Sequence, residues 1–181
     1  MNSKLIIIGL IVIAGLGISF LQIQSNTKPL PEQSLQINPQ WRTYTEPNTY
    51  SIQYPPNWIV ERSRRELVMI ISQPPVQNGT DKLPRDLIKT DVRIEPSSFE
   101  SLANQIFNTE TEQIIRQEQP TINGREALTL WIRDRFGANS VVTLIRYKPN
   151  ETIYIASFYT ADNTAAPQII QHLHGSLRVN E

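Results

Sequence analysis

The distribution of hydrophobic and polar residues divides the chain into three parts, of which the first is almost wholly apolar. Residues 5–21 carry no charge, and Ser19 is the polar exception. As an α-helix, this stretch from Leu5 to Leu21 would span about 26 Å, close to the thickness of the hydrocarbon core of a bilayer. The pattern therefore predicts a transmembrane or signal helix within residues 1–24.

The charges around this helix predict its orientation. Lys4 precedes it, and the next basic residue is Lys28. Because short basic segments are retained in the cytoplasm, we expect a cytoplasmic N-terminus and a domain on the far side of the membrane. The alternative is a signal peptide whose cleavage releases a secreted protein. Ile23, however, is a bulky residue for the outer position of a cleavage site at residues 23–25.

The second part, residues 25–45, contains many Gln, Asn, Pro and Ser residues and few large apolar ones. Proline restricts the backbone and favours extended, polyproline-like conformations. We therefore expect residues 25–45 to be a tether between the membrane helix and a folded domain at residues 46–181.

In the third part, short apolar stretches alternate with turn signals, which is typical of an α+β domain with an antiparallel sheet. Asn123-Gly124 predicts a tight hairpin turn, and Pro149-Asn150 predicts another turn. Strands are expected at residues 50–54, 58–60, 67–71, 87–95, 112–119, 125–131, 141–147 and 153–159.

Two segments have the hydrophobic period of a helix. Ser97 and Glu100 have the spacing of a capping box at the start of the first. Asn163 or Thr164 can cap the second, and Gly175 is placed to end it. The expected apolar stripes are Phe99, Leu102, Ala103, Ile106 and Phe107 in the first helix and Ala166, Ile169, Ile170 and Leu173 in the second.

Composition excludes several functions. Lys and Arg together number 17, as do Asp and Glu, so the formal net charge is zero. Non-specific nucleic-acid binding needs a strong positive field, and we therefore expect no nucleic-acid partner. The sequence has no cysteine, which excludes disulfides, thiolate metal sites, a cysteine nucleophile and a lipid-modified cysteine.

The only two histidines, His172 and His174, lie near the end of the second expected helix. They project about 200° apart around the helix axis, so their rings do not converge easily. They are weak candidates for metal ligands, since a zinc site would need further ligands from elsewhere. We expect them instead to interact with the negative end of the helix dipole.

Two basic segments are candidate contact surfaces. Arg62, Arg64 and Arg65 form a cluster that could dock on an acidic partner or on lipid headgroups. Arg133, Arg135 and Phe136 lie in a charged hairpin tip, where an exposed aromatic residue beside arginines would suit a protein interface. A solvated surface is the simpler interpretation of both.

Several of these segments resemble the PsbP-like family. They are Tyr50-Ser-Ile-Gln-Tyr-Pro-Pro-Asn-Trp58, the Asn123-Gly124 turn with the strand from Arg125 to Trp131, the strand end Ser157-Phe158-Tyr159, and a last helix followed by Ser176-Leu177-Arg178-Val179. The resemblance covers about residues 44–180. It implies an α/β/α sandwich, in which helices flank an antiparallel sheet of about six strands. The best-known members are lumenal subunits of photosystem II.

These observations support hypotheses of different classes. The leading one is a non-enzymatic, membrane-anchored PsbP-like domain in the periplasm or thylakoid lumen that stabilises a membrane protein complex. Its partners would be the membrane and a protein, with no cofactor. The alternative is a secreted module that binds a small ligand or a metal. An enzyme is a third possibility, which would require titratable groups with perturbed pKa values to converge in a cleft.

Overall fold

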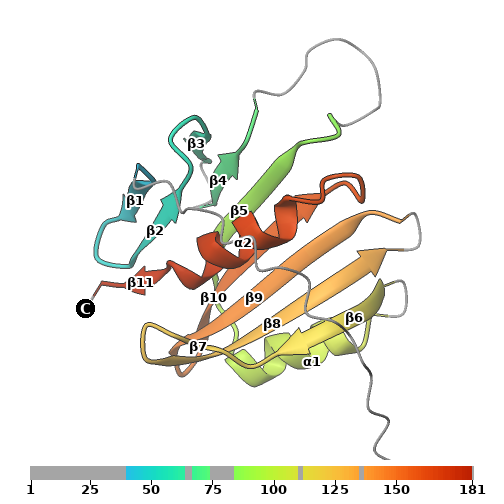
Figure 1. The fold of residues 1–181 in the computed structure, drawn as a ribbon. Coiled ribbons are helices and arrows are strands. Elements are labelled where there is room, and N and C mark those ends of the chain that lie inside the picture. Colours follow the sequence, from blue (N-terminus) through green and yellow to red (C-terminus); the bar gives the residue numbers. More distant parts are fainter. Residues whose placement is uncertain (1–39, 64–66, 74–83, 110–111, 135–136, 181) are drawn as a thin grey trace, which may run out of the picture. The chain divides into compact units, whose positions relative to one another are not determined.

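The computed structural model describes residues 40–63, 67–73, 84–109, 112–134 and 137–180. Within these ranges the chain forms two helices and eleven strands (Figure 1). In chain order they are β1 (Arg42–Glu46), β2 (Tyr50–Tyr54), β3 (Ile59–Arg62), β4 (Val68–Ile71), β5 (Ile88–Glu95), α1 (Phe99–Phe107), β6 (Glu112–Glu118), β7 (Thr121–Ile122), β8 (Arg125–Asp134), β9 (Asn139–Lys148), β10 (Glu151–Tyr159), α2 (Ala166–Gly175) and β11 (Arg178–Val179).

The main sheet is antiparallel and has the strand order β3-β4-β5-β10-β9-β8-β6, with β7 paired to β8. Strands β8, β9 and β10 form the expected meander of successive antiparallel neighbours. In the described residues this sheet has eight strands, and β1, β2 and β11 form a separate three-stranded sheet. The implied count of about six strands was therefore too low for the main sheet, where the short strand β7 was missed, and the sequence also missed β1 and β11 of the smaller sheet.

The two helices cover opposite faces of the main sheet (Figure 1). On one face, Leu128 and Leu130 of β8 pack with Phe99 of α1. On the other face, Trp131 of β8 packs with Ile170 of α2. Alternate strand residues point to opposite faces, so β8 is buried on both sides. This arrangement confirms the predicted layers.

The three-stranded sheet shares the α2 side of the domain. Tyr50 and Ile52 of β2 belong to the same buried cluster as Leu173 of α2. Tyr44 of β1 packs against this cluster, and β1 pairs with β2 along its whole length. Residues 42–45 are therefore part of the folded domain, and the predicted tether at residues 25–45 extends too far toward the C-terminus.

The first residues of α1 differ from the prediction by one position. Ser98, and not Ser97, is the N-cap, since its hydroxyl accepts a hydrogen bond from the Ser101 amide at 3.3 Å. The predicted apolar stripe is buried up to Ala103. Phe107 is 44 % exposed, because it lies at the end of α1 beside the edge strand β6.

The C-terminal end of α2 also differs from the prediction. Gly175 is the last helical residue and does not have a positive φ, whereas Ser176 is the C-cap in a right-handed conformation. The Ser176 amide donates to the His172 carbonyl at 2.9 Å, and its hydroxyl donates to the Leu173 carbonyl at 2.7 Å. These bonds satisfy terminal carbonyls without a left-handed glycine. At the start of α2, the Asn163 side chain accepts from the Ala166 amide at 3.1 Å.

Asn123 and Gly124 both have positive φ, at 51° and 74°, and join β7 to β8. These values fit a type I′ turn, and the tight hairpin turn predicted from the sequence is confirmed. Neither helix in the part of the chain that the structure describes has the length and apolar character of a membrane span. The expected membrane helix from Leu5 to Leu21 lies outside the described residues.

Candidate functional site

His174 is buried between α2 and the main sheet, with 3 % of its surface exposed. Its Nδ1 lies 2.8 Å from the Thr143 hydroxyl on β9, and its Nε2 lies 2.8 Å from the Ser157 hydroxyl on β10. Both ring nitrogens therefore have hydrogen-bond partners within the protein. A metal ion could bind neither nitrogen without breaking one of these bonds.

The hydrogen bonds continue across the sheet in both directions. The Thr143 hydroxyl lies 2.9 Å from that of Thr129 on β8, and the Ser157 hydroxyl lies 2.7 Å from that of Thr90 on β5. Thr129 is paired with Thr143 in the strand register, and Thr90 with Ser157. We call these five side chains, Thr90, Thr129, Thr143, Ser157 and His174, the His174 network.

Burial lowers the pKa of His174 from its usual 6.5 to about 3. The ring is thus neutral at physiological pH, with one nitrogen donating and the other accepting. We expected His174 to interact with the negative end of the helix dipole, which is most favourable for a charged ring. That expectation was wrong for His174, because the side chain points into the sheet and carries no charge.

His172 points elsewhere, as its helical spacing from His174 predicted. Its ring packs edge-on against Trp41, with 4.3 Å between ring centres and an interplanar angle of 71°. Its Nε2 is buried and has no hydrogen-bond partner. The contact places Trp41 on the folded domain.

Ser157 and His174 resemble the nucleophile and base of a hydrolase only in their hydrogen bond. Ser157 is 0 % exposed, so a substrate cannot reach its hydroxyl. The second nitrogen of His174 bonds a threonine hydroxyl, where a catalytic triad would have a carboxylate. This arrangement fits a buried structural network in which each polar group is satisfied.

Sequence reasoning missed the His174 network. Each of Thr90, Thr129, Thr143 and Ser157 places a hydroxyl within a different strand, β5, β8, β9 or β10. That pattern is a weak signal, because the sequence does not show that the four hydroxyls share one face and one histidine.

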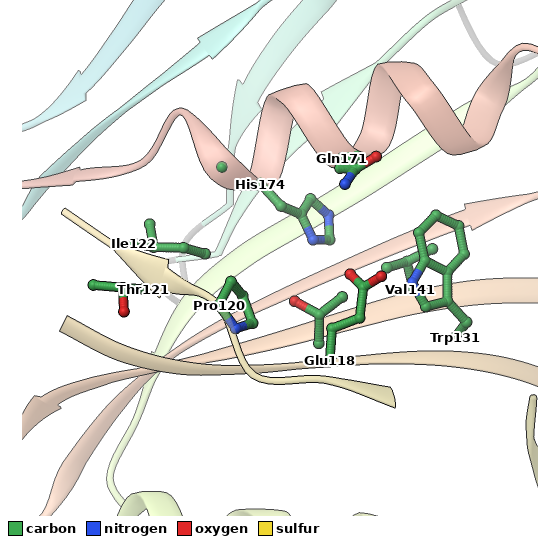
Figure 2. A pocket seen from close by; sticks show the side chains of 10 residues that line it. Glu118, Pro120, Thr121, Ile122, Trp131, Val141, Gln171 and His174 are labelled. Carbon is green, nitrogen blue, oxygen red and sulfur yellow. The ribbon is translucent and has the colours of Figure 1, made fainter. Parts of the chain in front are cut away.

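A cavity of about 190 Å³ lies beside Thr129 and His174 (Figure 2). Trp131 and Val141 line it from the sheet, Glu118 from the end of β6, and Gln171 from α2. The Trp131 Nε1 is buried and has no hydrogen-bond partner. Figure 2 shows the nitrogen edge of the Trp131 ring turned toward the carboxylate of Glu118. We call this cavity the Trp131 pocket.

A second candidate surface lies on the opposite side of the sheet, next to the region that α1 covers. Lys89, Asp91 and Arg93 of β5 lie beside Phe158 and Tyr154 of β10, and we call these five residues the β5–β10 face. The Arg93 guanidinium is 4.4 Å from the centre of the Tyr154 ring, and the Lys89 ammonium is 5.8 Å from that of Phe158. Phe158 is 45 % exposed.

A hollow of about 590 Å³ adjoins this face, lined in part by Lys89, Asp91 and Phe158. The Asp91 Oδ2 accepts from Lys89 at 2.9 Å, while its Oδ1 is buried without a partner. The face therefore offers an accessible aromatic ring and two cations, each paired with a carboxylate of the same strand.

The predicted arginine surfaces do not form one site. Arg62 on β3 donates to the Glu46 carboxylate of β1 at 2.7 Å, so it links the two sheets. Arg133 on β8 donates to the Asn139 side chain at 3.3 Å. Four strands separate β3 from β8 in the main sheet. The other candidates, Arg64, Arg65, Arg135 and Phe136, lie outside the described residues.

No protein-family model and no curated protein sequence matches the chain. Solved structures do match. The cyanobacterial PsbP of Synechocystis sp. PCC 6803 has 13 % sequence identity and a TM-score of 0.51, covering 77 % of this chain and 92 % of that one. LpqN of Mycobacterium tuberculosis has 13 % identity and a TM-score of 0.51, covering 78 % and 91 %. The Ran-binding protein Mog1p of Saccharomyces cerevisiae has 11 % identity and a TM-score of 0.50, covering 78 % and 96 %. At these identities the likeness shows the fold, and the predicted PsbP-like fold is confirmed.

Proposed function

We propose that this chain is a non-catalytic domain of PsbP-like fold, anchored in a membrane by residues 1–24, that binds and stabilises a protein complex outside the cytoplasm. The uncharged stretch from Leu5 to Leu21, with Lys4 before it, supports the anchor and its orientation. Among proteins of similar fold, Mog1p is described as Ran-binding and LpqN as involved in cell envelope biogenesis. A photosynthetic complex is one candidate partner, given the likeness to cyanobacterial PsbP.

The observation that carries this proposal is the β5–β10 face. Protein interfaces are enriched in aromatic residues and arginine, and here Phe158 is exposed while Arg93 stacks on Tyr154. The stacked arginine is already ordered, so binding costs it little conformational entropy.

The charges of this face favour a protein over a lipid surface. Lys89 and Arg93 on β5 are each paired with an acidic neighbour on the same strand, Asp91 and Glu95. An anionic membrane attracts an excess of positive charge, which these balanced pairs do not provide. A protein surface with its own mixed charges is the better match.

Burial of the Ser157–His174 pair supports a non-catalytic role. The two side chains hold α2 to the sheet, and their hydrogen bonds are already satisfied by Thr90 and Thr143. Using Ser157 as a nucleophile would require opening the domain.

The proposal is tested by isolating the full chain from its native membrane with a mild detergent and identifying the proteins that co-purify. Phe158→Ala removes the exposed ring of the β5–β10 face. Phe107→Ala is the matched control, because Phe107 is exposed to almost the same degree, 44 % against 45 %, but lies on α1. We expect the partner to co-purify with the wild type and with Phe107→Ala, and to be lost with Phe158→Ala.

A second matched pair tests the stacked cation. Arg93→Gln removes the guanidinium from the Tyr154 ring, and Arg146→Gln removes an equivalent guanidinium that lies 4.7 Å from the centre of the Phe99 ring. Only Arg93→Gln should weaken co-purification. Recovery of the domain alone from wild-type membranes, or equal recovery of the partner with all four variants, would contradict the proposal.

The mass of the native N-terminus tests the anchor separately. An intact Met1 region supports an uncleaved membrane helix. A chain that begins near Asn26 would support the secreted alternative. The Trp131 pocket is the observation that favours this second candidate, a module that binds a small ligand.

A further inference from the structure

We infer that the Trp131 pocket is a binding site for a small uncharged ring compound that carries a hydrogen-bond acceptor next to an N–H donor, such as a cyclic amide or a cyclic urea. The acceptor would bond the indole N–H of Trp131, and the donor would bond the carboxylate of Glu118. This site is separate from the β5–β10 face that carries the leading proposal, since it lies on the α2 side of the sheet while that face lies on the α1 side, and it names the ligand class of the second candidate.

The strongest indication is the unpaired indole N–H. Trp131 is 6 % exposed and lines a cavity, and its Nε1 is buried without a hydrogen-bond partner. Buried polar groups are nearly always paired in folded proteins, so an unpaired donor at a cavity wall indicates a partner that enters the cavity.

The indole ring is held in place from two sides. It packs with Ile170 and Val141 beneath α2, and the Arg116 guanidinium lies 5.4 Å from its centre. A ring fixed in this way cannot turn its N–H toward another acceptor without repacking the core. The donor therefore stays directed at the cavity, as Figure 2 shows.

Glu118 supplies the complementary acceptor. Its carboxylate pairs with Arg116, and its side chain is 28 % exposed. At neutral pH a carboxylate accepts hydrogen bonds and repels anions. Arg116 already offsets this negative charge, so a positively charged ligand would gain little binding energy. An uncharged ligand with an N–H donor fits best.

The volume limits the size of the ligand. A cavity of about 150 Å³ accommodates benzene, and the Trp131 pocket is somewhat larger, at about 190 Å³. Gln171 at the α2 wall offers an amide that can donate and accept. The pocket therefore suits a five- or six-membered ring with one or two substituents.

The test is a titration of the full chain, in a non-ionic detergent and labelled with 15N at tryptophan, with imidazolidin-2-one as the probe. The chain has three tryptophans, so its indole region contains three N–H resonances, and Trp131→Phe identifies the one of interest. We expect that resonance to shift downfield and to saturate, while the indole resonance of Trp58 stays in place. Sodium benzoate, a ring of similar size with a negative charge, should leave both unchanged.

Three variants complete the test, with probe binding followed on the ligand signals. Trp131→Phe keeps an aromatic ring but removes the donor, and we expect binding about tenfold weaker. Trp58→Phe is its matched control and should bind as the wild type does. Glu118→Gln keeps the shape of the rim and should also weaken binding. This variant keeps the test decisive if Trp131→Phe fails to fold.

The inference is overturned if the Trp131 resonance does not respond to the cyclic urea, or responds equally to benzoate. Unchanged affinity in both Trp131→Phe and Glu118→Gln would overturn it as well. None of these results bears on the proposed partner at Phe158, so the two proposals fail independently.

Discussion

Burial of neutral His174 should make the stability of the domain depend on pH in a defined window. The pKa of His174 is about 3 in the folded protein and 6.5 in the unfolded chain. Between these values the unfolded chain binds one more proton than the folded protein, so lowering the pH favours unfolding. The stabilising effect is complete above about pH 6.5 and is lost as the pH falls toward 3.

The size of this effect follows from the shift. Each pH unit inside the window changes the free energy of unfolding by about 1.4 kcal/mol. Going from about pH 8 to about pH 5 should therefore cost about 2 kcal/mol, because only the range below 6.5 contributes. His174 is almost fully buried, so solvent screening does not reduce this figure.

Urea unfolding of the full chain, followed by tryptophan fluorescence at both pH values, measures this loss. Carboxylates also bind protons as the pH falls, and they change the stability of both proteins. The difference in stability loss between the wild type and His174→Gln therefore isolates the contribution of the histidine. His174→Gln should itself lower stability at pH 8 by about 2 kcal/mol, since Thr143 or Ser157 loses its partner. His172→Gln is the matched control and should keep the pH dependence. If the wild type and His174→Gln lose equal stability between the two pH values, the reasoning about His174 is refuted.

Two further predictions concern local backbone structure and are measured as changes in the urea midpoint. Gly124→Ala should destabilise the domain by about 1 kcal/mol, because φ is 74° there, whereas Gly175→Ala, at a helical position with open space around it, should be neutral or slightly stabilising. Ser98→Ala should lower the free energy of unfolding by about 1 kcal/mol, because the N-cap is lost, and Ser97→Ala should lower it clearly less. A larger loss with Ser97→Ala would favour the capping box expected from the sequence.

Local features of this chain were predictable because their causes lie within a few residues. The Asn123-Gly124 turn is an example, since both residues tolerate positive φ and few others do. The starts and ends of helices were less predictable. Ser97 and Ser98 are chemically equal candidates for the N-cap, and the choice depends on where α1 meets the sheet. The strands that the sequence missed, β1, β7 and β11, have few residues or a polar pattern.

The candidate sites could not be predicted in the same way. Thr90, Thr129, Thr143 and Ser157 come from four strands, and the register of those strands brings them to one histidine. The two surfaces proposed here depend equally on distant pairings, such as Arg93 with Tyr154. The arginine segments were predicted as contact surfaces because their charges are adjacent in the chain. In the structure, Arg62 instead links the two sheets through its hydrogen bond to Glu46.

By itself, the sequence determined the order of the two helices and the longer strands, the alternation along β8, and the tight turn before it. These follow from side-chain period and backbone preference, which act over short distances along the chain. Only the tertiary structure decided that His174 is uncharged and that Trp131, at a cavity wall, has a buried N–H without a partner. Both depend on burial by residues far away in the sequence, which the folded chain alone brings together.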